Sequence, residues 1–268
     1  MPGRIPLALT RPGSRGRPNE DAVRVGPGWA VVVDGAGVPA RFRGGCSHTV
    51  EWYSTRLADH LAQGLAQALG TSTSDLRTVL AHAIDQVRAH HSESCDLDSG
   101  SPSATVALFL LSGATLHHLV LCDASVLVAS NDGRVERHTD LRIDAAVASG
   151  RLHHQQLVAR GLDPDEASRH SNDHIEALRN HPGGFWCAQA DPAVAEKALM
   201  GSWPLAEVET VMACSDGITR AVDMLDLHSD ATLLEAACTD PEALLDSIRS
   251  AEVLRKGQGK LHDDATLA

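Results

Sequence analysis

The sequence lacks any apolar run long enough to cross a bilayer. Its longest run extends from Ala104 to Leu111, with Thr105 inside it, whereas a membrane-spanning helix needs about 20 apolar residues. Met1 to Arg17 carry scattered Pro, Gly and Arg in place of the continuous apolar core of a signal peptide. These absences predict a soluble, cytoplasmic protein with no membrane partner.

Basic residues are also in short supply. The chain has 23 Lys and Arg against 35 Asp and Glu, which gives a net charge of −12. Proteins that bind nucleic acids or anionic membranes gain affinity from Lys and Arg against phosphates, so this balance predicts no nucleic-acid partner.

No C-x-x-C pair occurs among the six cysteines, so their spacing argues against a zinc knuckle or a thioredoxin-like site. Cys122 and Cys214 lie inside apolar runs and are expected to be small core residues. Cys46 and Cys95 lie in polar, loop-like stretches. A catalytic Cys46 paired with His48 is an alternative that no further signature supports.

The most informative stretch is Val31-Val32-Val33-Asp34-Gly35-Ala36-Gly37, in which a β-branched run ends at an acid followed by glycines. Glycine permits close backbone approach, and its carbonyl together with the carboxylate offers the oxygen ligands that hard divalent cations prefer. An ordinary strand ending in an Asp-Gly turn is the alternative interpretation.

The remaining pattern alternates strands and amphipathic helices. Val23 and Val25 lie on a short strand that forms a hairpin with 29–33, and two helices follow from His48 onward. We expect an antiparallel meander over 103–138, a strand at 208–214, and helices around 144–160, 164–180, 231–238 and 241–255. The chain of 268 residues shows no internal repeat or linker, so we expect one domain spanning 1–268.

The segment 141–185 is polar and rich in histidine. We expect these histidines to be solvated residues on helix faces, since only His170 and His174 have a spacing that suits a metal.

Acids recur where predicted strands begin or end. Such acids collect at one edge of a sheet, where like charges repel unless cations neutralise them. Oxygen-only ligands favour Mg²⁺ or Mn²⁺ over zinc or copper. The segments concerned are Glu20-Asp21, Asp34-Gly35, Asp123, Asp216-Gly217 and Asp263-Asp264.

The order N-E-D-A, V-V-D-G-x-G, strand-x-D-x, C-S-D-G and D-x-x-T resembles the metal-dependent protein phosphatases of type 2C over nearly the whole chain. This resemblance implies an α+β fold, a four-layer α/β/β/α sandwich of two antiparallel sheets flanked by helices. It also implies a site for two Mn²⁺ or Mg²⁺ ions at one edge and a flap formed by 141–185.

Carried over by position, Asp34 would bridge both ions, and Asp216 and Asp263 would hold one of them. Glu20 and the Gly35 carbonyl would face the other ion. Asp21 would be a supporting acid, and Asp123 with Asp216 would form a third, weaker metal site. Because Gly16 occupies the position of the family's phosphate-binding arginine, Arg15 or Arg17 would bind the phosphate instead.

The hypothesis is therefore a metal-dependent phosphomonoester hydrolase whose metal-activated water attacks phosphorus without a covalent enzyme intermediate. The preferred substrate is phosphoserine or phosphothreonine in a protein. The alternatives are a small phosphorylated metabolite or another metal-assisted reaction on the same scaffold, and a catalytically weak regulatory or binding module.

Overall fold

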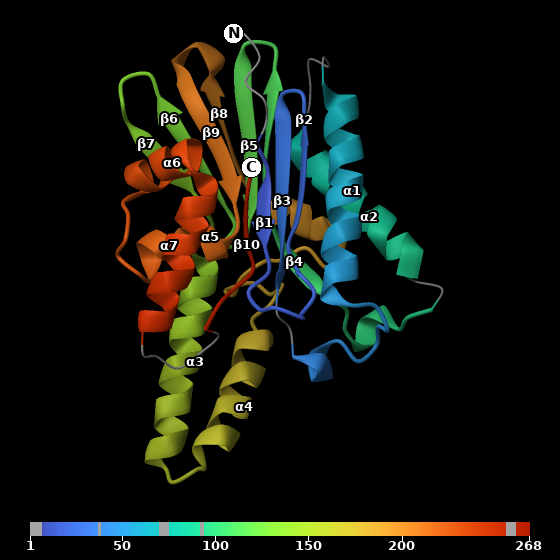
Figure 1. Ribbon diagram of the computed structural model, residues 1–268. Coiled ribbons are helices and arrows are strands. Elements are labelled where there is room, and N and C mark those ends of the chain that lie inside the picture. Colours follow the sequence, from blue (N-terminus) through green and yellow to red (C-terminus); the bar gives the residue numbers. More distant parts are fainter. Residues whose placement is uncertain (1–6, 37–38, 70–74, 92–93, 256–260) are drawn as a thin grey trace.

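The computed structural model describes residues 7–36, 39–69, 75–91, 94–255 and 261–268. Two five-stranded sheets lie face to face, all of their strand pairs are antiparallel, and helices cover the outer face of each sheet (Figure 1). The α+β, four-layer sandwich expected from the sequence is confirmed.

The first sheet has the order β2-β3-β4-β5-β8. Its strands are β2 (Ala22–Gly26), β3 (Trp29–Ala36), β4 (Ser103–Ser112), β5 (Thr115–Leu121) and β8 (Leu199–Pro204). The predicted hairpin of β2 and β3 is present, with Ala22 opposite Val33.

The second sheet has the order β1-β10-β9-β6-β7. Its strands are β1 (Leu9–Arg11), β10 (Ala265–Leu267), β9 (Val208–Cys214), β6 (Ser125–Ser130) and β7 (Val135–His138). The two ends of the chain meet here, because Leu9 pairs with Leu267.

The predicted meander over 103–138 is wrong in one respect. β4 pairs with β5 and β6 pairs with β7, but β5 and β6 belong to different sheets. The chain crosses between the sheets at Cys122, whose φ of 64° lies in the left-handed region that turns the backbone sharply. Two hairpins in opposite layers therefore replace the meander.

Helices α1 (Val50–Ala68) and α2 (Leu76–His91) pack on the first sheet, while α5 (Asp216–Asp223), α6 (Asp230–Thr239) and α7 (Pro241–Leu254) pack on the second. α1 begins at Thr49, whose hydroxyl accepts a hydrogen bond from the Trp52 N–H and satisfies one of the unpaired donors of the first turn. Short 3₁₀ turns complete the chain at η1 (Ala40–Phe42), η2 (Leu97–Ser99), η3 (Pro192–Lys197) and η4 (Leu205–Glu207).

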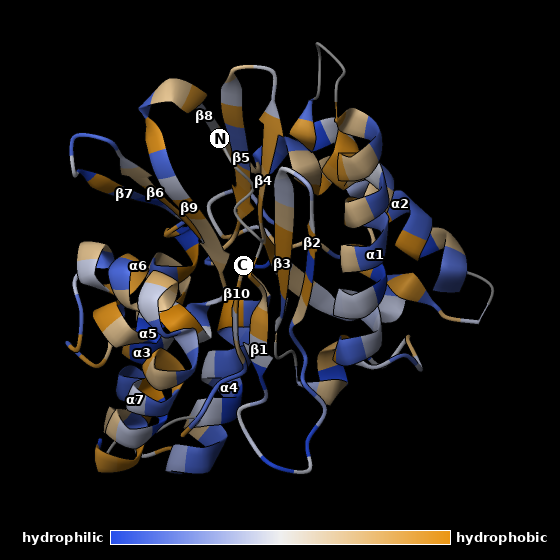
Figure 2. Ribbon diagram, turned by 45° about the horizontal axis from the view of Figure 1, so that its top comes forward, coloured by the Kyte–Doolittle hydropathy of each residue, from blue (hydrophilic) through white to orange (hydrophobic). Residues whose placement is uncertain are grey.

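Alternation along β3 explains its continuous valine run. Val31 and Val33 pack toward α1 and α2, while Ala30 and Val32 pack between the two sheets. Because successive side chains of a strand point to opposite faces, a strand covered on both faces is apolar at every position. Figure 2 shows the same apolar layer along the strands inside the sandwich.

Helices α3 (Arg142–Ala159) and α4 (Pro164–Glu176) project beyond one end of the sandwich (Figure 1). They occupy the predicted flap segment, and their histidines are exposed or half-buried as expected. A small core of Cys122, Ala146, Phe185 and Cys187 anchors their base. Within the described residues, no helix combines the length and apolarity needed to traverse a bilayer.

Candidate metal-binding acid cluster

The acids predicted from the sequence converge at one end of the two sheets. Asp123 follows β5, Asp216 begins α5 directly after β9, and Asp263 lies just before β10. Asp34 lies inside β3, opposite Thr105 of β4, so the strand continues past the predicted end at Val33. The charges of Asp21, Asp123, Asp216 and Asp263 all act on Asp34.

Burial and mutual repulsion make this cluster reluctant to ionise. Burial raises the pKa of Asp34 well above its usual range, and the four neighbouring carboxylates raise it further. The pKa of Asp216 is likewise raised by burial, then by Asp123 and Asp263, and Arg220 opposes the shift only in part. A cation placed among these groups would remove both penalties.

Asp21 is the most deeply buried acid of the set, with 6% of its surface exposed. Neither of its carboxylate oxygens has a hydrogen-bond partner among the described residues. Burial raises its pKa to about 6, although the hydroxyls of Thr266 and Ser215 act in the opposite direction. Unpartnered buried oxygens of this kind fit a role in holding a nearby cation.

Asp264, unlike its neighbour Asp263, binds backbone N–H groups with both of its carboxylate oxygens. Its two carboxylate oxygens accept hydrogen bonds from the backbone N–H groups of Gly13 (2.6 Å) and Glu20 (2.7 Å). The carboxylate thereby ties the segment before β2 to the segment before β10. Both of its oxygens are used in this way, so Asp264 positions Glu20 and Asp21.

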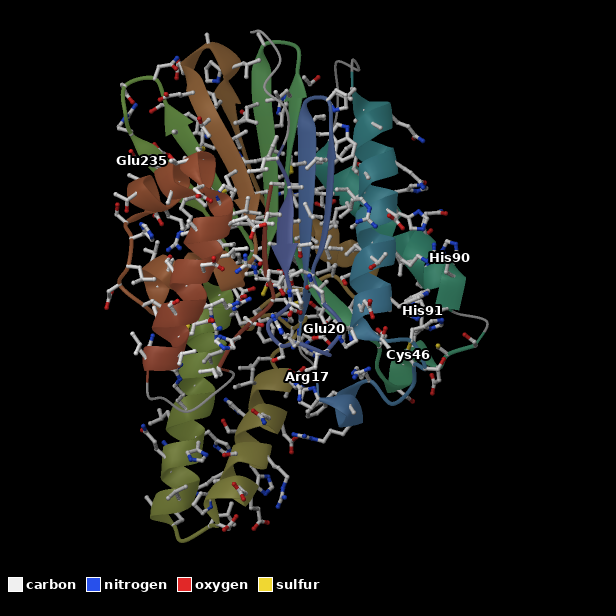
Figure 3. All side chains as sticks on the ribbon, in the orientation of Figure 1. Arg17, Glu20, Cys46, His90, His91 and Glu235 are labelled. Atoms are coloured by element: carbon white, nitrogen blue, oxygen red, sulfur yellow. The ribbon has the colours of Figure 1, made fainter. Side chains whose placement is uncertain are left out.

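Glu20 and Gly35 lie against each other. A Cβ atom at Gly35 would come within 2.6 Å of the Glu20 carbonyl oxygen and 2.5 Å of Val50 Cγ1. Only glycine fits at this place, as the sequence predicted from the need for close backbone approach. Figure 3 shows Glu20 at the end of the sheets, with Arg17 beside it.

An ion-pair network missed by sequence reasoning supports Asp263. Arg220 of α5 lies 3.8 Å from the Asp263 carboxylate and 2.7 Å from Glu252 of α7. Glu252 also pairs with Arg249 at 3.0 Å and with His262 at 2.6 Å. Arg220 and Glu252 are far apart in the sequence and belong to no recognisable motif, so no sequence signal could have revealed this network.

Asp123 faces the base of the flap. Burial raises its pKa, its own N–H group and the Cys122 thiol lower it, Asp144 of α3 raises it, and Arg179 lowers it. Arg179 is itself held by Glu176 at 2.7 Å and contacts Ser103 at 3.2 Å. Sequence reasoning missed Asp144 and Arg179, two charged residues of the segment 141–185 that act on Asp123.

Arg15 and Arg17 are exposed and lie in the turn that precedes Glu20. The Arg17 N–H donates to the Ser14 carbonyl at 3.4 Å, which closes this turn. Arg15 and Arg17 therefore precede Glu20 by five and three residues on an exposed turn.

The fold and the cluster together define a sandwich with a carboxylate-lined site at one end. The protein phosphatase 2C family model matches residues 12–248, and the chain belongs to this family. Membership supports a phosphatase that hydrolyses phosphate esters. Among curated proteins, no relative matches.

Solved structures of bacterial phosphatases share the fold. The serine/threonine phosphatase PstP/Ppp of Mycobacterium tuberculosis has 18% sequence identity and a TM-score of 0.57 over 97% of this chain and 95% of that one. Stp1 of Staphylococcus aureus has 16% identity and a TM-score of 0.56 over 100% and 97%. A PstP catalytic domain with two manganese ions has 18% identity and a TM-score of 0.55 over 97% and 94%.

Proposed function

We propose that this protein is a Mn²⁺- or Mg²⁺-dependent phosphatase that acts on phosphoserine or phosphothreonine in proteins. The observation that carries the proposal is the convergence of four acids from separate segments on Asp34, whose pKa they raise together with burial. The two manganese ions in the PstP catalytic domain support a two-metal site in this fold.

The acids around Asp34 are the residues that would hold such a pair of ions. Asp34 would lie between them, Asp216 and Asp263 would hold one, and Glu20 with the Gly35 carbonyl would hold the other. Asp123 with Asp216 offers a third position. When bound, the ions supply Lewis acidity and an activated water for attack on phosphorus.

The other residues of the site position these groups. Asp264 fixes the backbone at Glu20, and the Glu252–Arg220 pair supports Asp263. Arg15 or Arg17 would neutralise the phosphate oxygens from the solvent side, as charge-assisted donors do. The flap of α3 and α4 extends from the same end and offers a surface for a protein substrate.

The test compares Asp34→Asn with Asp263→Asn by calorimetric Mn²⁺ titration and by phosphopeptide hydrolysis. Asn preserves size, so the fold should survive, and loss of the shared ligand should weaken both ions and lower kcat/KM at least about a hundredfold. Asp263→Asn should weaken mainly one ion. Because one repelling charge is removed, the metal-free Asp34→Asn protein should melt at a higher temperature than wild type.

Asp132→Asn, in the exposed β6–β7 turn, is the matched control and should behave as wild type. Normal Mn²⁺ stoichiometry and turnover in Asp34→Asn would refute the bridging role. Full activity after exhaustive chelation would exclude the metal mechanism. Faster turnover of small phosphorylated metabolites than of phosphopeptides would reassign the substrate.

A further inference from the structure

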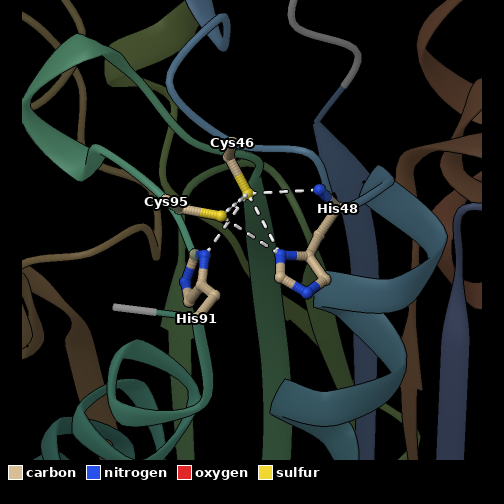
Figure 4. Close-up of side chains that lie close together, drawn as sticks. All are labelled: Cys46, His48, His91 and Cys95. Atoms are coloured by element: carbon tan, nitrogen blue, oxygen red, sulfur yellow. Dashed lines mark hydrogen bonds between the residues drawn. The ribbon is translucent and has the colours of Figure 1, made fainter. Parts of the chain in front are cut away.

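Four side chains outside the acid cluster converge on one point. Cys46 and His48 lie in the loop before α1, His91 ends α2, and Cys95 lies in the loop that follows. One sulfur or nitrogen atom from each lies within 4.8 Å of the other three, and no other such group of His, Cys, Asp or Glu occurs in the described part of the chain. Figure 4 shows all four pointing inward.

Four of the six distances between these atoms are close to the edges of a zinc tetrahedron, and the other two are within 4.8 Å. Cys46 Sγ lies 3.4 Å from His48 Nδ1, 3.3 Å from His91 Nδ1 and 3.4 Å from Cys95 Sγ. Cys95 Sγ lies 3.4 Å from His48 Nδ1. Zinc bonds of about 2.3 Å to sulfur and 2.0–2.1 Å to nitrogen give tetrahedral edges of about 3.3–3.8 Å.

We propose that Cys46, His48, His91 and Cys95 form a structural Zn²⁺ site. Two thiolates and two imidazoles are a ligand set that selects zinc over the hard cations suited to the acid cluster. All four positions are filled by protein, which is the closed arrangement of structural zinc and leaves none open for substrate.

Groups around the four ligands hold them in place. The His48 ring stacks on Trp52 at 3.9 Å, and Trp52 meets the His91 ring edge-on at 5.3 Å. The backbone N–H of His48 donates to Cys46 Sγ at 3.4 Å, and the Ser94 hydroxyl lies 3.6 Å from Cys95 Sγ. Such outer contacts orient metal ligands and stabilise thiolate charge.

The two loops that supply the ligands already touch. The Asp96 N–H donates to the Gly45 carbonyl at 2.8 Å, and the Gly45 N–H donates to the Ser99 carbonyl at 3.2 Å. A side chain at Gly100, whose φ is +99°, would overlap the Phe42 carbonyl. Zinc would therefore cross-link two loops whose backbones are already hydrogen-bonded to each other. Both loops belong to the part of the sequence that connects β3 to β4.

The loop that carries Cys46 also contacts helix α4 of the flap segment. Arg41, shortly before Cys46, pairs with Asp173 of α4 at 2.7 Å and donates to the Arg169 carbonyl at 3.3 Å. A metal that fixes this loop would fix one of the flap's attachments to the sandwich.

The first experiment measures the zinc content of the full chain, purified under reducing conditions after expression with added zinc. We expect about one Zn²⁺ per chain, retained through gel filtration and lost in Cys46→Ser and His91→Gln. The matched controls are Cys238→Ser on α6 and His90→Gln beside the site, which should keep the metal. Equal zinc in Cys46→Ser and Cys238→Ser would overturn the proposal.

Cobalt substitution distinguishes this site from the acid cluster. Co²⁺ in a tetrahedral field of two thiolates should give strong visible bands and a thiolate charge-transfer band, both unchanged in Asp34→Asn and absent in Cys46→Ser. A spectrum that disappears in Asp34→Asn would assign the cobalt to the carboxylates and refute the site.

A third measurement uses the wild-type protein alone, in case a ligand variant fails to fold. Bound zinc should shield Cys46 and Cys95 from alkylation, and a strong zinc chelator should expose both. Rapid alkylation of both thiols in zinc-loaded protein would contradict the proposal. A disulfide between them that persists in the purified protein, with no zinc uptake after its reduction, would also contradict it.

Discussion

Glu252 offers a quantitative test of the network behind the acid cluster. Only 4% of it is exposed, and its two oxygens contact Arg220, Arg249 and His262 at 2.7, 3.0 and 2.6 Å. Glu252→Ala leaves two guanidinium groups without this carboxylate, and their side chains are only 11% and 16% exposed. Breaking a buried pair by removing one partner costs about 3–5 kcal/mol.

We therefore expect Glu252→Ala to lower the melting temperature by about 10 °C, since 1 kcal/mol corresponds to about 2–4 °C in a protein of about this size. The matched control is Glu242→Ala on the same helix. Glu242 pairs with Arg11 but is 61% exposed, so its loss should cost less than about 1 kcal/mol. Equal destabilisation of the two variants, in melts or urea titrations, would refute the reasoning.

The same residue carries a functional consequence that rests on the proposed metal site. Glu252→Gln keeps the shape but removes the charge that neutralises Arg220, which then competes more strongly for Asp263. We expect the Mn²⁺ concentration for half-maximal activity to rise about tenfold, as for other residues that support metal ligands. An unchanged Mn²⁺ requirement in a destabilised Glu252→Gln protein would show that the network has only a structural role.

Two further predictions concern the fold. His118 is 2% exposed and lies 4.2 Å from the ring of His138, and burial, followed by the charge of His138, lowers its pKa to about 4. Because the unfolded chain protonates His118 more readily than the folded protein does, the free energy of unfolding is highest above pH 6.5 and falls by about 2 kcal/mol at pH 5. His118→Leu should therefore reduce the difference between the melting temperatures at pH 7 and pH 5. At Gly217 a Cβ atom would overlap the Asp264 carbonyl, so Gly217→Ala should destabilise the protein by about 1–3 kcal/mol. The control is Gly44→Ala, because a Cβ atom at the exposed Gly44 would meet nothing within 4 Å and Gly44 does not have a positive φ, so this variant should melt as wild type does.

The fold and the acid cluster were largely predictable because their signals are local. Apolar periodicity marked the long helices, and alternation with turn residues marked β3, β4 and β6. The other acids of the cluster follow or precede strands, Asp34 lies within the last three residues of β3, and strands of one sandwich end at common edges. The same local view failed at Cys122, since nothing in Cys122-Asp123-Ala124 distinguishes a crossing between sheets from a tight turn within one.

Short strands and distant partners escaped prediction for a related reason. β1 and β10 have three residues each and exist as strands because they pair with one another across nearly the whole chain. β8 is an edge strand with exposed Leu199 and Met200, and its sequence Leu-Met-Gly-Ser-Trp-Pro shows no alternation of apolar and polar residues. Long-range pairing creates these elements, and a sequence window does not contain it.

A sequence window also failed to reveal the cluster of Cys46, His48, His91 and Cys95. Spacing along the sequence argued against zinc because no C-x-x-C pair is present, yet α1 and α2 separate the two halves of this ligand set and their packing returns the halves to one place. Two helices that pack in an antiparallel pair bring the start of the first beside the end of the second. A ligand pair before one helix and another after its partner is therefore a spacing worth testing for metal in any helical hairpin, however many residues lie between.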